Sequence, residues 1–157
     1  MARGFELEIE LDYNTDTPYN DILWKNDWVR GFTVTFTFTI TNKSQYVFPG
    51  TTIKVILEEH SSLRETDLVR TYSPLIEIPE LEPNAYIVSA EHEYTPRLEG
   101  MCEIVLASPA FKRKEVVISG SMQRTAVQTR ISSLFTVIGW QELEIIQLLR
   151  KIVNRKD

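Results

Sequence analysis

The two histidines of the chain lie among carboxylates, a combination that could hold a divalent metal ion. His60 follows two glutamates, and His92 lies between two more. Imidazoles together with a carboxylate suit zinc and similar cations, so a metal-dependent hydrolase around His60 and His92 is one hypothesis. In a regular strand, however, a histidine and its flanking glutamates point to opposite faces of the sheet. We therefore favour solvated surface histidines over a metal site.

Three aromatic rings lie close to aspartates in and beside the polar segment 13–27. The rings belong to Tyr19, Trp24 and Trp28, and the segment is rich in Asn, Asp, Thr and Pro, which favour turns and loops. Flat rings beside carboxylates can stack on a sugar and bind its hydroxyl groups, so a carbohydrate-binding module is a second hypothesis. The same rings can instead close one end of a β-sandwich. We favour this structural role, and we keep the three residues as candidate ligand contacts.

No other pattern in the sequence points to catalysis or to a bound cofactor. The single cysteine, Cys102, lies in an apolar stretch with no neighbouring base, which predicts a small core residue. The sequence around Gly120 lacks the outer glycines of a nucleophile elbow, and the chain contains no phosphate-binding glycine loop. We therefore expect a protein that is not an enzyme and that needs no cofactor.

Length and composition predict one folded domain. The chain has 157 residues, of which 43% are hydrophobic and 25% charged, as in ordinary globular proteins. Its 17 basic and 22 acidic residues give a net charge of −5, which argues against nucleic acid as a partner. No apolar run reaches the roughly 20 residues of a membrane span, and the N-terminus lacks the pattern of a signal peptide. We therefore expect a cytoplasmic protein without a membrane span.

Alternating apolar and polar residues predict β-strands along most of the chain. Residues 5–13 and 29–41 alternate most regularly, with apolar residues and threonines on opposite faces of the second segment. Further strands are predicted at 52–59, 75–78, 85–94, 101–107 and 114–119, with turn-forming residues between them. Asn42 begins a glycosylation sequon, which we interpret as a turn. About seven strands at this spacing indicate an immunoglobulin-like antiparallel β-sandwich over residues 1–139.

The last residues follow a helical rather than a strand pattern. Apolar residues recur at helical spacing within 140–154, among residues that favour helices. This stripe contains Ile145, Leu148, Leu149 and Ile152. The pattern predicts an amphipathic α-helix in a C-terminal extension, residues 140–157. Its apolar stripe must pack either on the sandwich or on a partner molecule, and we favour packing on the sandwich.

Four segments resemble immunoglobulin-like modules of the CARDB and NEW3 type, which occur in bacterial and archaeal proteins. The segments are ITNKS at 40–44, IKVIL at 53–57, IPELEPN at 78–84 and LEGMCEI at 98–104. The resemblance covers residues 33–107, about half of the chain, and the C-terminal helix has no counterpart in these modules. The resemblance implies adhesion or protein contact without catalysis, and it supplies no site residues.

These patterns together favour a non-enzymatic protein-interaction or structural module. Its contacts would be made through the edges of the sheets or through the C-terminal helix, with a protein partner or with a second copy of the chain. The carbohydrate-binding and metal-dependent hypotheses are the alternatives.

Overall fold

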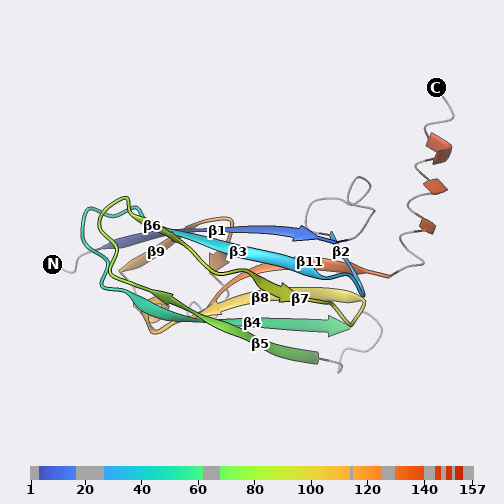
Figure 1. Cartoon of the computed structure of the whole chain (residues 1–157), viewed down its shortest axis with the longest axis horizontal. Coiled ribbons are helices and arrows are strands. Elements are labelled where there is room, and N and C mark those ends of the chain that lie inside the picture. Colours follow the sequence, from blue (N-terminus) through green and yellow to red (C-terminus); the bar gives the residue numbers. More distant parts are fainter. Residues whose placement is uncertain are drawn as a thin grey trace.

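The computed structural model places the strands in two sheets that face each other (Figure 1). It describes residues 4–16, 27–61, 68–113, 115–124, 130–139, 144–145, 148–149 and 151–153. The five-stranded sheet contains β1 (Phe5–Thr15), β3 (Val34–Asn42), β6 (Tyr86–Val88), β7 (His92–Tyr94) and β9 (Val116–Gly120). The six-stranded sheet contains β2 (Asp27–Val29), β4 (Thr51–Ser61), β5 (Leu68–Ile78), β8 (Gly100–Ala107), β10 (Gln123–Arg124) and β11 (Arg130–Ile138). A short 3-10 helix, η1 (Pro109–Lys112), follows β8.

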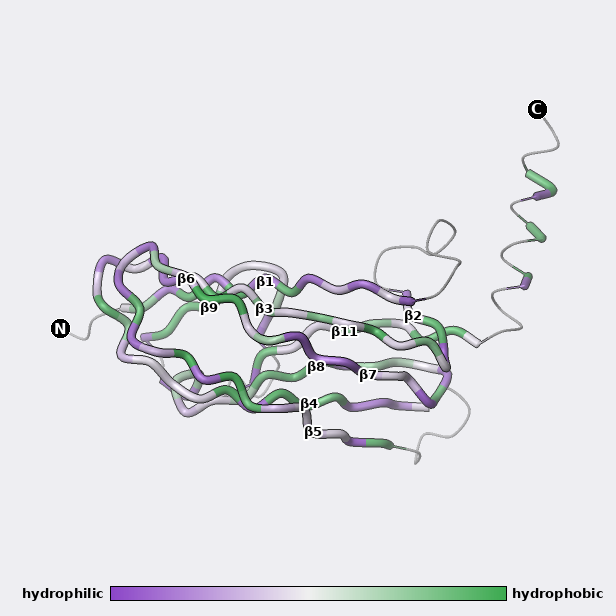
Figure 2. Tube along the Cα trace, viewed as in Figure 1, coloured by the Kyte–Doolittle hydropathy of each residue, from purple (hydrophilic) through white to green (hydrophobic). Residues whose placement is uncertain are grey.

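The core forms between the sheets because apolar residues alternate with polar ones in the strands. In β3, Val34, Phe36, Phe38 and Ile40 are buried, while the threonines between them are half-buried. Hydrophobic and hydrophilic residues alternate in the same way along the tube in Figure 2. Each fully buried side chain of this size stabilises the fold by about 1.5–3 kcal/mol. The predicted β-sandwich is therefore confirmed as two packed sheets with one core.

Two strand pairs run parallel, so the prediction of a purely antiparallel sandwich was wrong. β9 lies parallel to β1, with Phe5 opposite Val116, and β2 lies parallel to β11, with Val29 opposite Ile138. Parallel neighbours need a long connection, and most of the chain separates β1 from β9. Alternation shows which face of a strand is buried, but it carries no information about strand direction. The described residues also contain eleven strands rather than about seven.

The segment 29–41, predicted as one strand, contributes to both sheets. β2 ends at Val29 in the six-stranded sheet, and β3 begins at Val34 in the five-stranded sheet. Between them, the amide of Phe32 donates a hydrogen bond to the carbonyl oxygen of Val29 at 3.2 Å. Gly31 has a φ of +89°, which glycine adopts without steric cost. The chain therefore crosses from one sheet to the other at this turn.

β5 is longer than predicted, but its predicted position at a sheet edge is confirmed. Among the described strands it pairs with β4 alone. The register shifts so that Ile76 lies opposite Ile53, while Ser73 lies opposite Val55, which places Pro74 in a bulge. A residue in a bulge need not donate to the ladder of hydrogen bonds. This irregularity allows an eleven-residue strand to contain a proline.

Asn42 organises the turn after β3. Its side chain is 0% exposed, and its amide nitrogen donates to the carbonyl oxygens of Tyr46 and Leu81 at 2.8 and 2.9 Å. Its amide oxygen accepts a hydrogen bond from the backbone nitrogen of Ser44 at 3.0 Å. Every polar atom of this buried amide therefore has a partner. The predicted turn is confirmed, and the Asn42 side chain is buried in the folded protein.

The described residues near the C-terminus are helical and fall in three short stretches. These segments are 144–145, 148–149 and 151–153, and they lie beyond the end of the sandwich at which β11 ends (Figure 1). The prediction of a continuous amphipathic α-helix is not borne out, and the other residues of 140–157 lie outside the described residues. No helix in the described part of the chain is long and apolar enough to cross a membrane.

Candidate functional site

The predicted partner contacts near the C-terminus are exposed to solvent. Ile145, Leu148, Leu149 and Ile152 are 57%, 60%, 56% and 44% exposed, and Val153 beside them is 64% exposed. The favoured packing of these side chains on the sandwich is therefore not observed. Exposed apolar side chains that cluster in this way mark interaction sites. We call residues 144–153 the C-terminal segment and treat it as the candidate contact surface.

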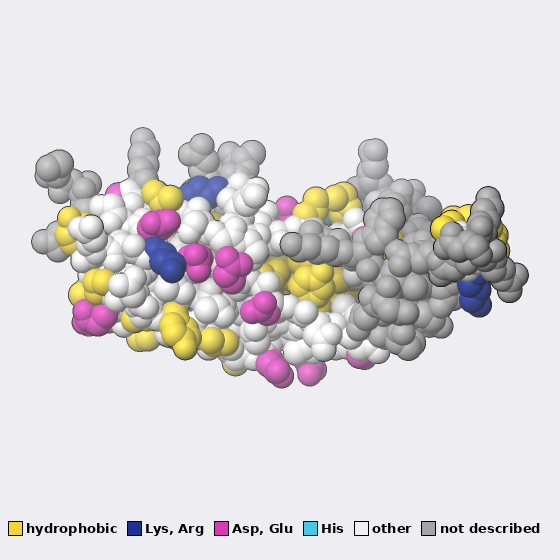
Figure 3. Space-filling model, turned by 90° about the horizontal axis from the view of Figure 1, so that it is seen from above, with side chains coloured by type: hydrophobic (Ala, Val, Ile, Leu, Met, Phe, Trp, Pro, Cys, Tyr) yellow, Lys and Arg dark blue, Asp and Glu magenta, His cyan; other side chains and the backbone are white. Residues whose placement is uncertain are grey.

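The edge strand β5 presents a second apolar surface. Leu68, Tyr72 and Leu75 are exposed, and the outer edge of β5 has no neighbouring strand among the described residues. Unpaired backbone groups on such an edge can pair with a strand of another protein. The outer face of the five-stranded sheet is different, because Asp and Glu side chains gather there (Figure 3). β5 is therefore an apolar edge of the kind that the predicted sheet-edge contact needs.

Trp28 lies in the core and does not contribute to an exposed platform. The side chain is 0% exposed, and its ring stacks on Phe135 with a centroid distance of 4.1 Å and an interplanar angle of 15°. The ring of Tyr13 packs edge-on against Trp28 at 6.0 Å. The structural role that we favoured for Trp28 is therefore confirmed. Tyr19 and Trp24, the other two candidate ligand contacts, lie outside the described residues.

The two histidines belong to different sheets and do not form a common site. His60 is exposed near the end of β4, whereas His92 is buried in β7 of the other sheet. Within the described ranges, no group of three or more His, Cys, Asp or Glu side chains could hold a metal ion. The metal-site hypothesis required the strands of the two histidines to be neighbours, and they are not, since β4 and β7 belong to different sheets. His92 is also not the solvated residue that we expected.

His92 connects the edges of the two sheets. Its ring stacks on Phe36 at 5.3 Å and packs edge-on against Phe38 at 5.9 Å. Its Nδ1 atom lies 2.6 Å from the hydroxyl oxygen of Ser73 in β5, and the two atoms form a hydrogen bond between the sheets. Burial lowers the pKa of His92, because the protonated ring would lose its hydration. The neutral ring is therefore the form that the folded protein holds.

Replacing His92 by asparagine should make the free energy of unfolding depend less on pH in the acidic range. The pKa of His92 is lower in the folded protein than its ordinary value of 6.5. The unfolded chain therefore takes up this proton first, and the folded state loses stability as the pH falls below about 6.5. Urea denaturation at several pH values would measure the effect, with His60→Asn as the exposed control. If the free energy of unfolding falls equally with pH in the wild type and in His92→Asn, burial of the neutral His92 ring does not cause the loss of stability.

A buried carboxylate, missed by the sequence analysis, lies at the centre of a polar cluster in the core. Glu59 is 0% exposed and accepts a hydrogen bond from the hydroxyl of Tyr94. The backbone amides of Arg97 and Leu98 donate to its Oε1 atom at 2.7 and 3.0 Å. The carboxylate thereby ties β4 to β7 and to the loop that leads into β8. We had grouped this glutamate with His60, although strand periodicity places it on the inward face with Ile53, Val55 and Leu57.

The other ionisable groups of this cluster stay protonated at neutral pH. Burial raises the pKa of Tyr94, and the hydrogen bond to Glu59 and the charge of Glu59 raise it further. Burial also raises the pKa of Cys102, with added contributions from the charges of Glu59 and Glu103. A protonated thiol is a poor nucleophile. The cluster is therefore suited to holding a loop, and the prediction that Cys102 is a core residue is confirmed by its 0% exposure.

Comparisons with known proteins identify the fold. No protein-family model matches the sequence, and no curated protein is significantly similar to it. The solution NMR structure of the CARDB domain of the PF1109 protein from Pyrococcus furiosus is similar, with a TM-score of 0.51 and 13% identity over 87% of this chain and 98% of that domain.

Two further structures are similar at lower scores. A crystal structure of the same Pyrococcus domain, in complex with di-metal ions, has a TM-score of 0.45 and 12% identity over 87% of this chain and 96% of that domain. A beta-glucosidase from Listeria innocua has a TM-score of 0.45 and 12% identity over 84% of this chain and 16% of the enzyme. The similarity to the solution structure, together with the two-sheet topology, shows that the protein has the β-sandwich fold of a CARDB domain over most of its length.

Proposed function

We propose that this protein is a non-enzymatic interaction module that associates through its C-terminal segment. The observation that carries the proposal is the exposure of five large apolar side chains in that segment, each between 44% and 64%. Removing such surface from water is worth about 25 cal/mol per Å². This free energy is gained only when another surface covers the segment. The apolar edge strand β5 offers a second contact of the same kind.

A second copy of the chain is the partner that the charges favour. Glu142 and Glu144 lie near the start of the C-terminal segment, and Arg150, Lys151 and Arg155 lie near its end. Two copies that pair in antiparallel orientation would place the acidic part of each segment beside the basic part of the other. Opposite charges that flank an apolar seam set the orientation of paired helices.

Association would also stabilise the helix that the sequence pattern predicts. The described residues of the segment are helical. A helix of about four turns is marginal alone and becomes stable when its apolar face is packed. The amphipathic helix is therefore proposed as the structure of the paired segment.

Light scattering after size exclusion tests the proposal. We expect the full chain to have the mass of a dimer, and the chain ending at Gly139 to be a folded monomer. Leu148→Asp should also give a monomer, because a carboxylate in an apolar seam costs several kcal/mol to desolvate, roughly the free energy of a weak dimer. Far-UV circular dichroism should show less helix in both variants.

Val117→Asp is the matched control for Leu148→Asp. Val117 is 57% exposed, close to the 60% of Leu148, but it lies on β9 of the sandwich. This control should keep the mass of the dimer. A monomeric full chain, or a dimer that survives both the truncation and Leu148→Asp, would contradict self-association through the C-terminal segment.

A further inference from the structure

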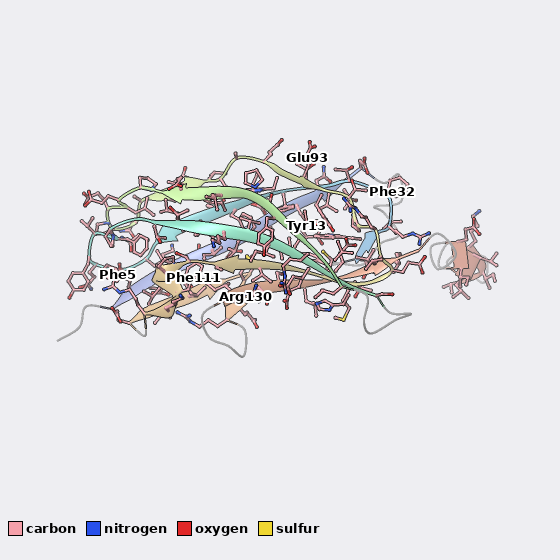
Figure 4. The ribbon with its side chains drawn as sticks, turned by 90° about the horizontal axis from the view of Figure 1, so that it is seen from below. Phe5, Tyr13, Phe32, Glu93, Phe111 and Arg130 are labelled. Atoms are coloured by element: carbon pink, nitrogen blue, oxygen red, sulfur yellow. The ribbon has the colours of Figure 1, made fainter. Side chains whose placement is uncertain are left out.

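A hollow of about 480 Å³ lies on the outer face of the six-stranded sheet, beside η1. Three basic side chains from three different elements line it, namely Lys54 of β4, Lys112 of η1 and Arg130 of β11. Figure 4 shows Arg130 at the same end of the sheet as Phe111 of η1. No Asp or Glu of the described residues lines the hollow. This concentration of positive charge runs against the net charge of −5 of the whole chain.

Strand register creates both the hollow and its charge. Ala107 of β8 lies directly opposite Lys54 on one side and opposite Arg130 on the other. A methyl side chain between two long ones leaves a depression between the cations. The hydroxyl of Ser108 accepts a hydrogen bond from the amide of Ala110 at 3.3 Å and so caps η1 beside this depression. The fold therefore places the three residues that carry these cations around one depression.

The cations around the hollow are only partly neutralised. Lys54 and Lys112 form no ion pair within the described ranges. Arg130 lies 3.3 Å from the Oε1 atom of Glu58, but the same oxygen lies 3.1 Å from Arg70. One carboxylate is thus shared between two guanidinium groups. Arg130 keeps donors that can bind another anion.

One further carboxylate lies near the rim. The hydroxyl of Thr52, which lines the hollow, donates a hydrogen bond to Glu77 on β5 at 2.8 Å. Glu77 is therefore held by a hydroxyl group and not by one of the lysines. The hollow keeps a net positive charge.

We propose that this hollow binds a small organic phosphate. A phosphoryl group carries about −1.5 to −2 charge at neutral pH and accepts several hydrogen bonds. Lys54, Lys112 and Arg130 supply the positive charges and the donors that such a group needs. Guanidinium groups bind such oxygens in bidentate fashion, and lysines bind them as point charges. Leu75 and Pro109 provide an apolar wall for the organic part of the ligand. The volume is in the range of sites for small molecules.

Titration of the full chain with phenyl phosphate, followed by amide chemical shifts, tests this site. We expect saturable shifts centred on residues 105–113, and weaker binding as salt is added. Lys112→Gln and Lys54→Gln should each weaken binding about tenfold, the effect of losing one charge-assisted hydrogen bond. Both lysines are exposed, so the fold should be unaffected, and thermal melting of each variant checks this point.

Lys43→Gln is the matched control, because it removes the same charge from an exposed lysine at the end of the five-stranded sheet. It should bind phenyl phosphate as the wild type does, and Lys112→Arg should keep most of the affinity. Equal weakening by Lys43→Gln would overturn the site, as would shifts that do not saturate. Inorganic phosphate that binds as tightly as phenyl phosphate would overturn the assignment to organic phosphates.

Discussion

Replacing Glu59 by alanine is expected to lower the free energy of unfolding by about 3–5 kcal/mol, because three hydrogen bonds to a charged group, each worth about 1.5–3 kcal/mol, are lost together and the removed cost of burying the carboxylate offsets only part of this. The carboxylate is fully buried and accepts hydrogen bonds from Tyr94, Arg97 and Leu98. Alanine removes the acceptor of all three hydrogen bonds. The Tyr94 hydroxyl is the buried donor of the three, whereas the two backbone amides are part-buried. Urea denaturation followed by circular dichroism measures the change.

Three further variants separate the contributions to this cluster. Glu59→Gln keeps one acceptor oxygen, so its loss should be smaller than that of the alanine variant. Tyr94→Phe removes one hydrogen bond and should cost about 0.5–1.5 kcal/mol. Glu93→Ala is the matched control, since Glu93 is exposed and points away from the core (Figure 4), and it should change stability by less than about 0.5 kcal/mol. If Glu59→Ala is no more destabilising than Glu93→Ala, the carboxylate does not hold the loop before β8.

Trp28→Ala should destabilise the fold by a similar amount, about 3–5 kcal/mol, because it removes a large ring from a packed core. The ring stacks on Phe135 and contacts Tyr13. Its indole nitrogen is buried and has no hydrogen-bond partner in the described structure. Trp28→Phe keeps an aromatic ring and removes this unsatisfied donor, so its loss should be clearly smaller. Chemical denaturation of the two variants measures the difference.

Tyr86→Ala is the control for Trp28→Ala. Tyr86 is 65% exposed on β6, so its removal should change stability by less than about 0.5 kcal/mol. The same proteins test the carbohydrate-binding alternative, because a buried Trp28 cannot stack on a sugar. Trp28→Ala with unchanged stability but lost binding of a glycan would reverse our assignment of this residue to the core.

The sequence determined the fold class because side-chain alternation is a local property. In β1 and β3, each apolar residue had to face inward once a second sheet covered that face. The turn at Asn42 was also predictable from its bonds to Ser44 and Tyr46, which are near in the chain, whereas its bond to Leu81 was not. The buried position of Cys102 followed from its apolar strand. These features depend on neighbours in the chain and need no knowledge of distant partners.

Helical periodicity does not reveal the environment of the C-terminal segment. Leu148 and Ile152 have the spacing of an amphipathic helix, yet they are exposed in the structure. A helix of this length is stabilised by the surface on which it packs, and the pattern does not show which surface that is. The sequence therefore shows the apolar stripe, but it does not show whether the stripe is exposed or buried.

Strand direction, sheet membership and the grouping of distant side chains were decided only by the tertiary structure. His60 and His92 have similar surroundings in the sequence, but one is exposed in the six-stranded sheet and the other is buried in the five-stranded sheet. Lys54 and Arg130 lie far apart in the chain and flank the same alanine across β8. The physical reason is that a strand's alternation fixes which of its faces is apolar, whereas its neighbours are chosen by the packing of the whole core.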